Sequence, residues 1–267
     1  MDTSLPLTTT HARVDAEAAT VEIRQLTRRA ILAIWAAAAL PMAALSWLVA
    51  PVLADRFAGD GVVPMAKALI VCLTVGLVWQ FVLVAVLVRR EQRTLRWSTV
   101  RDALWLRSPR SPRSGRVGGR IWLILIPLIV GVGAIQALIP AFGAPANRDL
   151  ATLVQSDVGK AFLDGAWGWY GLLLVMFLFN TVLGEELLFR GYLLPRMNGA
   201  FGRGDWFANG VLFTLYHLHV PWVMPGTLLE SFLEAYPTKR YRSAWMGIAV
   251  HSAQSVVLGI LILTLVV

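Results

Sequence analysis

Long apolar runs without charged residues constrain this chain more than any other feature of its sequence. A membrane-spanning helix needs roughly 20 consecutive apolar residues. Four runs approach or exceed that length without a charged residue, 30–54, 68–88, 121–139 and 165–184, and two more, 206–229 and 243–267, carry only histidines as ionisable residues. Because the runs are continuous rather than alternating, they favour helices over β-barrel strands. The sequence therefore predicts an all-α fold, a polytopic transmembrane helical bundle with six long spans.

The positive charge is concentrated in one loop, residues 89–120. This loop holds ten arginines against two acidic residues, and the whole chain has a formal net charge of +8. Cytoplasmic loops of membrane proteins are enriched in Lys and Arg, so we expect this loop and the tail 1–29 to face the cytoplasm of a cell-membrane protein. The low-complexity end of the loop, RSPRSPRSGRVGGR, is typical of disordered segments. Anionic lipid is the expected partner of the loop, and no nucleic-acid partner is expected.

The same charge rule organises the rest of the chain. The predicted order is the tail 1–29, two spans in 30–88, the basic loop 89–120 and a helical block 121–267. Lys239, Arg240 and Arg242 precede the last span and indicate an inside position, whereas simple counting of spans would place them outside. We therefore expect a short or re-entrant return between Trp222 and Lys239, in a stretch interrupted by prolines. Its prolines are Pro221, Pro225 and Pro237.

Ionisable residues inside apolar runs are candidates for function because the bilayer makes them costly. The fourth run continues into EELLFR. Glu186 and Arg190 stand four residues apart, the spacing of a helical ion pair. Glu185 lies roughly 100° around the helix from Glu186 and has no partner in the local sequence.

The histidines follow in the last two runs. His217 and His219 are two residues apart, so on one helix they would point to nearly opposite faces and only one would reach an interior site. His251 and Ser255 share a face. If the last span starts inside, Glu185, His217 and His251 lie about 15, 16 and 9–12 Å deep at 1.5 Å per residue. A lone membrane histidine is most simply an interhelical hydrogen-bonding group, but three such residues at one depth favour a functional site.

A carboxylate and an imidazole can hold a water molecule and remove its proton, and a second imidazole can stabilise the oxyanion formed at a carbonyl. That combination hydrolyses an amide without a protein nucleophile. Glu185, His217 and His251 also suit a zinc site with two histidines and one glutamate. The sequence leaves both alternatives open, no cofactor or a divalent metal such as zinc; the soluble pattern HExxH is absent.

Three motifs resemble the CAAX protease and bacteriocin-processing family, the type II CAAX prenyl endopeptidase-like intramembrane peptidases. EExxxR is present as EELLFR, FxxxH as FTLYH with Phe213 and His217, and HxxxN as HSAQS with His251. The resemblance covers about 167–267. It implies that Glu185 activates water with help from His217, and that Glu186 and Arg190 support the site. The implied substrate is a peptide or a membrane protein.

The third motif departs from the family because Ser255 stands where the family has asparagine. The resemblance implies that His251 and this asparagine form the oxyanion hole, and loss of one such donor can cost about 10²–10³ in rate. Gln254 is a nearby substitute. The alternative function is a catalytically impaired member acting as a membrane scaffold or immunity-type protein. A weaker alternative is a small transporter that uses the same residues as a proton relay.

Overall fold

The computed structural model describes residues 21–267, and the part of the predicted tail in residues 1–20 lies outside the described residues. Within 21–267 the protein is helical without a β-strand, as the sequence predicts. Five helices in this part are long and apolar enough to cross a membrane: Arg28–Ala54, Val63–Gln92, Gly119–Leu138, Trp167–Arg196 and Ala244–Val266.

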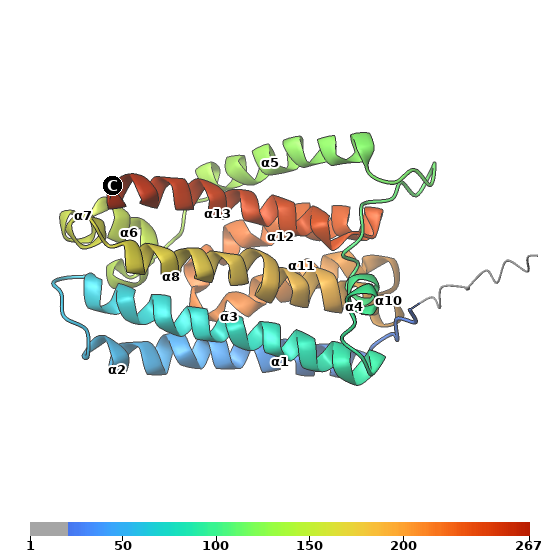
Figure 1. Cartoon of the computed structure of the whole chain (residues 1–267), viewed down its shortest axis with the longest axis horizontal. Coiled ribbons are helices and arrows are strands. Elements are labelled where there is room, and N and C mark those ends of the chain that lie inside the picture. Colours follow the sequence, from blue (N-terminus) through green and yellow to red (C-terminus); the bar gives the residue numbers. More distant parts are fainter. Residues whose placement is uncertain (1–20) are drawn as a thin grey trace, which may run out of the picture.

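These five helices run roughly parallel to the long axis of the molecule (Figure 1). The first combines α1 (Arg28–Ala44) and α2 (Ala50–Ala54) through a π-helical turn, and α3 (Val63–Gln92) packs against it. The fourth, which begins as α8 (Trp167–Leu178), lies between α3 and α13 (Ala244–Val266). Among the described helices, α5 (Leu125–Leu138) packs mainly against α12 and α13, and most of its side chains are exposed.

The fifth predicted span, 206–229, is not confirmed. In its place α11 (Asp205–Tyr216) ends after twelve residues, two 3₁₀ turns follow, and α12 (Met224–Tyr241) runs back along α11. The two helices pack closely at Gly210, where a β-carbon would lie 2.6 Å from Cδ1 of Phe232. An ion pair between Asp205 and Lys239 joins the outer ends of this α11–α12 hairpin. The hairpin therefore enters the bundle and returns to the same end, which agrees with the re-entrant return expected between Trp222 and Lys239.

The tail, the basic loop and the start of α13 lie at one end of the bundle, the loop end, which carries residues 89–120. The backbone N–H of Ala244 donates to the carbonyl of Trp105 at 2.9 Å, so α13 starts beside the basic loop. Leu26 of the tail donates to the carbonyl of Arg196 at 2.9 Å, and the Arg196 guanidinium pairs with Glu91 at 2.6 Å. The tail, the loop and the start of the last helix thus share one end, as the charge rule predicts.

The expectation of disorder at the low-complexity end of the basic loop, RSPRSPRSGRVGGR, is wrong. The first part of the loop forms α4 (Trp97–Ala103), where hydrogen bonds from Arg107 and then Arg101 hold the pKa of Asp102 below its usual range. Its arginine-rich part closes into a turn, with Arg110 and Val117 bridged as in a β-hairpin. Ser111 donates to Arg116 at 2.8 Å across this turn. Backbone hydrogen bonds across the turn supply the order that the composition does not indicate.

The opposite end of the molecule holds α6 (Leu150–Gln155), α7 (Asp157–Leu163) and the C-terminus (Figure 1). The backbone N–H of Gly165 donates to Val266 at 3.1 Å, which fastens the end of α13 to the start of the fourth span. Arg148 lies over the Trp47 ring at 4.3 Å and donates to the Ser46 carbonyl at 3.0 Å. These contacts close the bundle at the end remote from the basic loop.

Cysteine labelling tests this arrangement. In a Cys72→Ala background, Ser114→Cys, Arg203→Cys and Arg240→Cys should react with a membrane-impermeant maleimide from one side of oriented vesicles, since all three lie at the loop end. Gln155→Cys should react only from the other side. The positive-inside rule predicts that the first side is the cytoplasmic one. Labelling of Arg203→Cys and Arg240→Cys from opposite sides would contradict the re-entrant hairpin.

Candidate active site

The acidic motif lies in the middle of an irregular stretch of the fourth span. Residues Phe179–Gly184 and Leu187–Leu193 are π-helical, and Glu185 and Glu186 lie between the two segments. Widened turns of this kind occur often at functional sites. A β-carbon at Gly184 would lie 3.0 Å from the Leu77 carbonyl oxygen, so glycine there lets α3 approach this stretch closely. Both glutamates are buried.

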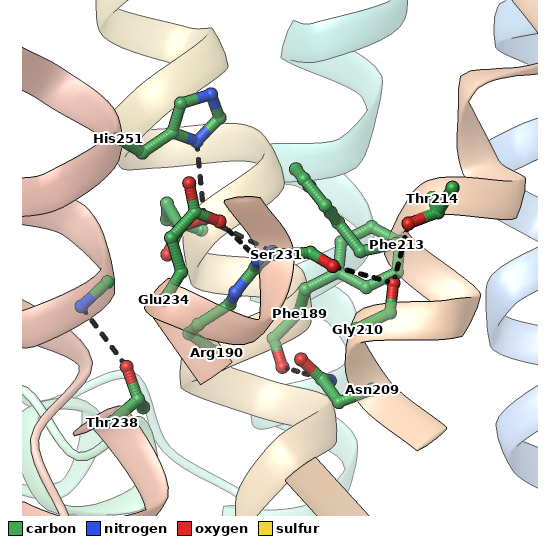
Figure 2. A network of polar contacts seen from close by, with 12 residues as sticks. Phe189, Arg190, Asn209, Gly210, Phe213, Thr214, Ser231, Glu234, Thr238 and His251 are labelled. Atoms are coloured by element: carbon green, nitrogen blue, oxygen red, sulfur yellow. Dashed lines mark hydrogen bonds and ion pairs between the residues drawn. The ribbon is translucent and has the colours of Figure 1, made fainter. Parts of the chain in front are cut away.

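Glu186 belongs to a buried charge cluster made of Glu186, Arg190, Glu234 and His251 (Figure 2). The Arg190 guanidinium lies 3.2 Å from Glu186 Oε1 on its own helix and also pairs with Glu234 of α12. Glu186 Oε1 lies 3.2 Å from Nδ1 of His251 on α13. The predicted ion pair between Glu186 and Arg190 is therefore present. Two carboxylates face one guanidinium, so the cluster is neutral when His251 is an imidazolium.

Phe213 connects this cluster to the second motif. The Arg190 guanidinium carbon lies 3.9 Å from the Phe213 ring centroid, close enough for a cation–π interaction. The same ring makes edge-on contacts with His217, at 4.9 Å between centroids, and with His251, at 5.9 Å. The phenylalanine of FTLYH thus packs between the charged side chains of the first motif and the imidazoles of the second and third.

Glu185 has a hydrogen-bonding partner outside the charge cluster. The Asn180 amide nitrogen, oriented to donate, lies 2.9 and 3.2 Å from the two carboxylate oxygens. The Tyr216 hydroxyl also lies close to Glu185. That hydroxyl accepts from Gln80 Nε2 of α3 at 2.6 Å, so its own proton is available for the carboxylate.

Two adjoining cavities meet at these residues. The first, of about 640 Å³, is lined mainly by apolar side chains and also by Glu185, His217 and Ser255. The second, of about 360 Å³, is more polar and is lined by His217, His251, Glu230 and Glu234, among others. His217 lines both, as do the residues Gln136, Asn180, Val223 and Gln254. The structure therefore brings Glu185, His217 and Ser255 together on one cavity and His217 and His251 on the next.

The expectation that only one of His217 and His219 faces the interior is wrong. Helix α11 ends at Tyr216, and His217–His219 form a 3₁₀ turn. The two imidazole rings stack with centroids 5.5 Å apart, and both line the first cavity. The opposite-face rule holds for a continuous α-helix, and here the helix has already ended.

The positions of the carboxylate oxygens and imidazole nitrogens test whether the site could bind a divalent metal. Among the described residues, the three-residue group whose ligand atoms lie within 4.8 Å of one another is Glu186, Glu234 and His251. It is not the set Glu185, His217 and His251 that the sequence suggests for zinc. Arg190 contacts both carboxylates of the gathered group, so a divalent cation there would have to displace a guanidinium or face its repulsion. The group Glu186, Glu234 and His251 therefore does not fit a metal.

Sequence reasoning missed four polar residues of this region: Gln80, Asn180, Tyr216 and Glu234. Glu234 offered a signal, since it lies with Glu230 at helical spacing inside the stretch expected to be re-entrant. Asn180 lies one turn before Glu185 in an otherwise apolar run. Gln80 and Tyr216 carried no signal, because uncharged polar residues in spans are common hydrogen-bonding groups.

Fold and site together define a polytopic membrane protein with buried glutamate and histidine side chains around two interior cavities. Residues 167–257 match the family model described as type II CAAX prenyl endopeptidase Rce1-like. This match contains all three motifs and confirms the resemblance to the CAAX protease and bacteriocin-processing family. No curated protein and no solved structure matches the chain. Rce1-like proteins are peptidases, so the match supports an enzyme.

Gly247 allows α13 to approach the charge cluster, and replacing it tests the packing. A β-carbon there would lie 2.5 Å from Glu186 Oε2 and 3.0 Å from Arg190 Cγ. Gly247→Ala should lower the free energy of unfolding by about 1–3 kcal/mol through overpacking. The control is Gly259→Ala on the same helix, where the new carbon meets Leu174 at an ordinary 3.6 Å. It should be neutral or stabilising by up to about 1 kcal/mol. Equal effects in denaturation of the purified variants would contradict the packing argument.

Proposed function

We propose that the protein is a membrane-embedded endopeptidase that hydrolyses a peptide bond of a membrane-associated substrate. One observation carries the proposal: Glu185 and His217 line the same cavity, and His217 also lines the adjoining cavity with His251. Glu185 and His217 can thus activate a water molecule on one side of a peptide bond bound where the two cavities meet. His251 can stabilise the oxyanion from the other side. The family match to residues 167–257 supports the same reaction class.

In this proposal Glu185 and His217 hold the attacking water. His217 Nδ1 lies 2.9 Å from the Phe213 carbonyl, which can only accept, so Nδ1 carries a proton. Nε2 of the neutral ring then offers a lone pair to the water. Water oxygen adds to the scissile carbonyl carbon while its proton passes to Glu185. The same proton goes to the amide nitrogen as the C–N bond breaks.

His251 supplies the oxyanion stabilisation in this proposal. Its Nδ1 donates to Glu186, which fixes the plane of the ring and leaves Nε2 to face elsewhere. Figure 2 displays that second nitrogen pointing away from Arg190 and Glu234. An N–H at this position can donate to the oxygen that becomes negative in the tetrahedral intermediate. Ser255, one helical turn further along α13, or its neighbour Gln254 is the candidate second donor.

The apolar walls of the first cavity favour a substrate with an apolar or lipidated segment next to the cleaved bond. A prenylated C-terminus is the substrate class that the family description suggests. Leader peptides and membrane proteins are further candidates. We place the loop end, with its arginines, at the cytoplasmic face of the cell membrane, where it would contact anionic lipid.

Glu185→Gln and His217→Ala test the assignment of the water-activating pair. Each variant should cleave an internally quenched peptide with a prenylated cysteine near its C-terminus about 10²–10⁴-fold more slowly than the wild type. Because the two side chains act on one water, the double variant should lose no more than the poorer single variant. Purified proteins in lipid nanodiscs, checked for equal membrane insertion and unfolding temperature, are compared. Unchanged cleavage by Glu185→Gln would refute the assignment.

A non-catalytic scaffold is the second candidate, and the serine at position 255 favours it. Ser255 lines the first cavity with Glu185 and His217, but its hydroxyl reaches less far than the amide of an asparagine. If the missing amide limits the reaction, Ser255→Asn should raise the cleavage rate, by up to about 10²-fold. The same nanodisc assay measures this change. A cellular phenotype that survives the Glu185→Gln, His217→Ala double variant would favour the scaffold.

A further inference from the structure

Glu234 lies in none of the three motifs, yet it is part of the buried charge cluster. We propose that Glu234 is a positioning residue for His251 and that it acts through Arg190 and Glu186. This inference rests on the proposed function, in which His251 stabilises the oxyanion. It gives the α11–α12 hairpin a part in the reaction that the motifs do not indicate.

The contacts form a chain across three helices. Glu234 of α12 is buried and pairs with one guanidinium nitrogen of Arg190. A second guanidinium nitrogen lies 3.2 Å from Glu186 Oε1, and the same oxygen accepts from His251 Nδ1 at 3.2 Å. Arg190 is thus held from two sides, and its position fixes the oxygen that orients the imidazole. Without Glu234, the guanidinium would keep only its partner on the same helix.

Hydrogen bonds to two neighbouring helices fix the position of α12, the helix that carries Glu234. The Ser231 hydroxyl of α12 lies 3.2 Å from the Gly210 carbonyl of α11, and Thr238 Oγ1 accepts from the Gly247 N–H of α13 at 3.1 Å. These anchors lie on either side of Glu234 in sequence, and Figure 2 shows the hydrogen bonds of Ser231 and Thr238. Helix α12 is therefore tied to both neighbours close to the cluster. A side chain on such a helix can hold a partner within the narrow tolerance that catalysis requires.

The balance of charges around His251 also supports a positioning role for Glu234. Near His251 lie the carboxylates Glu185 and Glu186 of the fourth span and Glu230 and Glu234 of α12. The Arg190 guanidinium pairs with Glu186 and Glu234. Ionisable groups in apolar surroundings are stable when their charges balance. When the charge of Glu234 is removed, the charges of Arg190 and Glu186 neutralise each other. The attraction that draws the His251 ring to Glu186 then weakens.

A merely structural role is the rival explanation, and the chain supplies its control. Asp205 and Lys239 form a second ion pair that joins α11 to α12, and the Asp205 carboxylate is also buried. This pair lies at the outer end of the hairpin and makes no contact with His251. If Glu234 matters only because it fastens the hairpin, Asp205→Asn should reproduce the effect of Glu234→Gln.

The experiment compares the wild type, Glu234→Gln, Glu234→Asp and Asp205→Asn in nanodiscs. With the quenched prenylated peptide, Glu234→Gln should lower kcat by about 10²-fold at unchanged KM, because a displaced oxyanion donor affects the transition state rather than binding. Glu234→Asp, which keeps the charge, should recover part of the rate. Asp205→Asn should retain wild-type kcat. A loss of the same size in Asp205→Asn and Glu234→Gln would overturn the proposal.

A second measurement does not depend on activity. In ¹⁵N-histidine NMR spectra, with the His251 signal assigned from a His251→Asn variant, Glu234→Gln should shift that signal and Asp205→Asn should not. An unshifted His251 signal in Glu234→Gln would overturn the positioning role whether or not the peptide is cleaved. Failure of the wild type to cleave any peptide, with the NMR shift present, would instead refute the proposed function and leave the structural coupling established.

Discussion

The guanidinium of Arg190 is the interaction centre on which the rest of this structure depends. A fixed positive charge deep in an apolar bundle is costly unless it is paired. Here it is paired twice, with Glu186 of the fourth span and Glu234 of α12, and it lies over the Phe213 ring. Each of these partners lies on a different helix, and Glu186 also contacts His251 of α13. Neutralising one charge therefore fixes the relative positions of four elements.

The sequence predicts the part of this arrangement that follows local rules. The apolar runs identify the five long helices, and the i, i+4 rule identifies the pair Glu186 and Arg190. The sequence does not predict Glu234 as a partner, because no local rule pairs side chains 44 residues apart. Nor does it predict the end of α11. The run 206–229 is apolar enough for a span, but two 3₁₀ turns, His217–His219 and Pro221–Val223, break it into two shorter helices.

That break also explains why the two histidines do not behave as a helical pattern predicts. The shared interior exposure of His217 and His219 depends on where α11 ends, and the helix ends at Tyr216. The break places His217 at the junction of the two cavities, with its Nδ1 still bonded to the Phe213 carbonyl of the preceding turn. A continuous span would have carried the chain across the bundle. The hairpin instead returns Glu234 to the level of Arg190.

The site is not confined to the region that matches the family model. Gln80 of α3 donates to the Tyr216 hydroxyl, which lies close to Glu185, so a helix from the first half of the chain supports the acidic residue of the first motif. Helix α5 contributes Gln136 to both cavities, together with apolar side chains along the first. Residues 167–257 supply the three motifs. The preceding helices supply walls for both cavities and a hydrogen bond behind Glu185, so the buried site requires both halves of the chain.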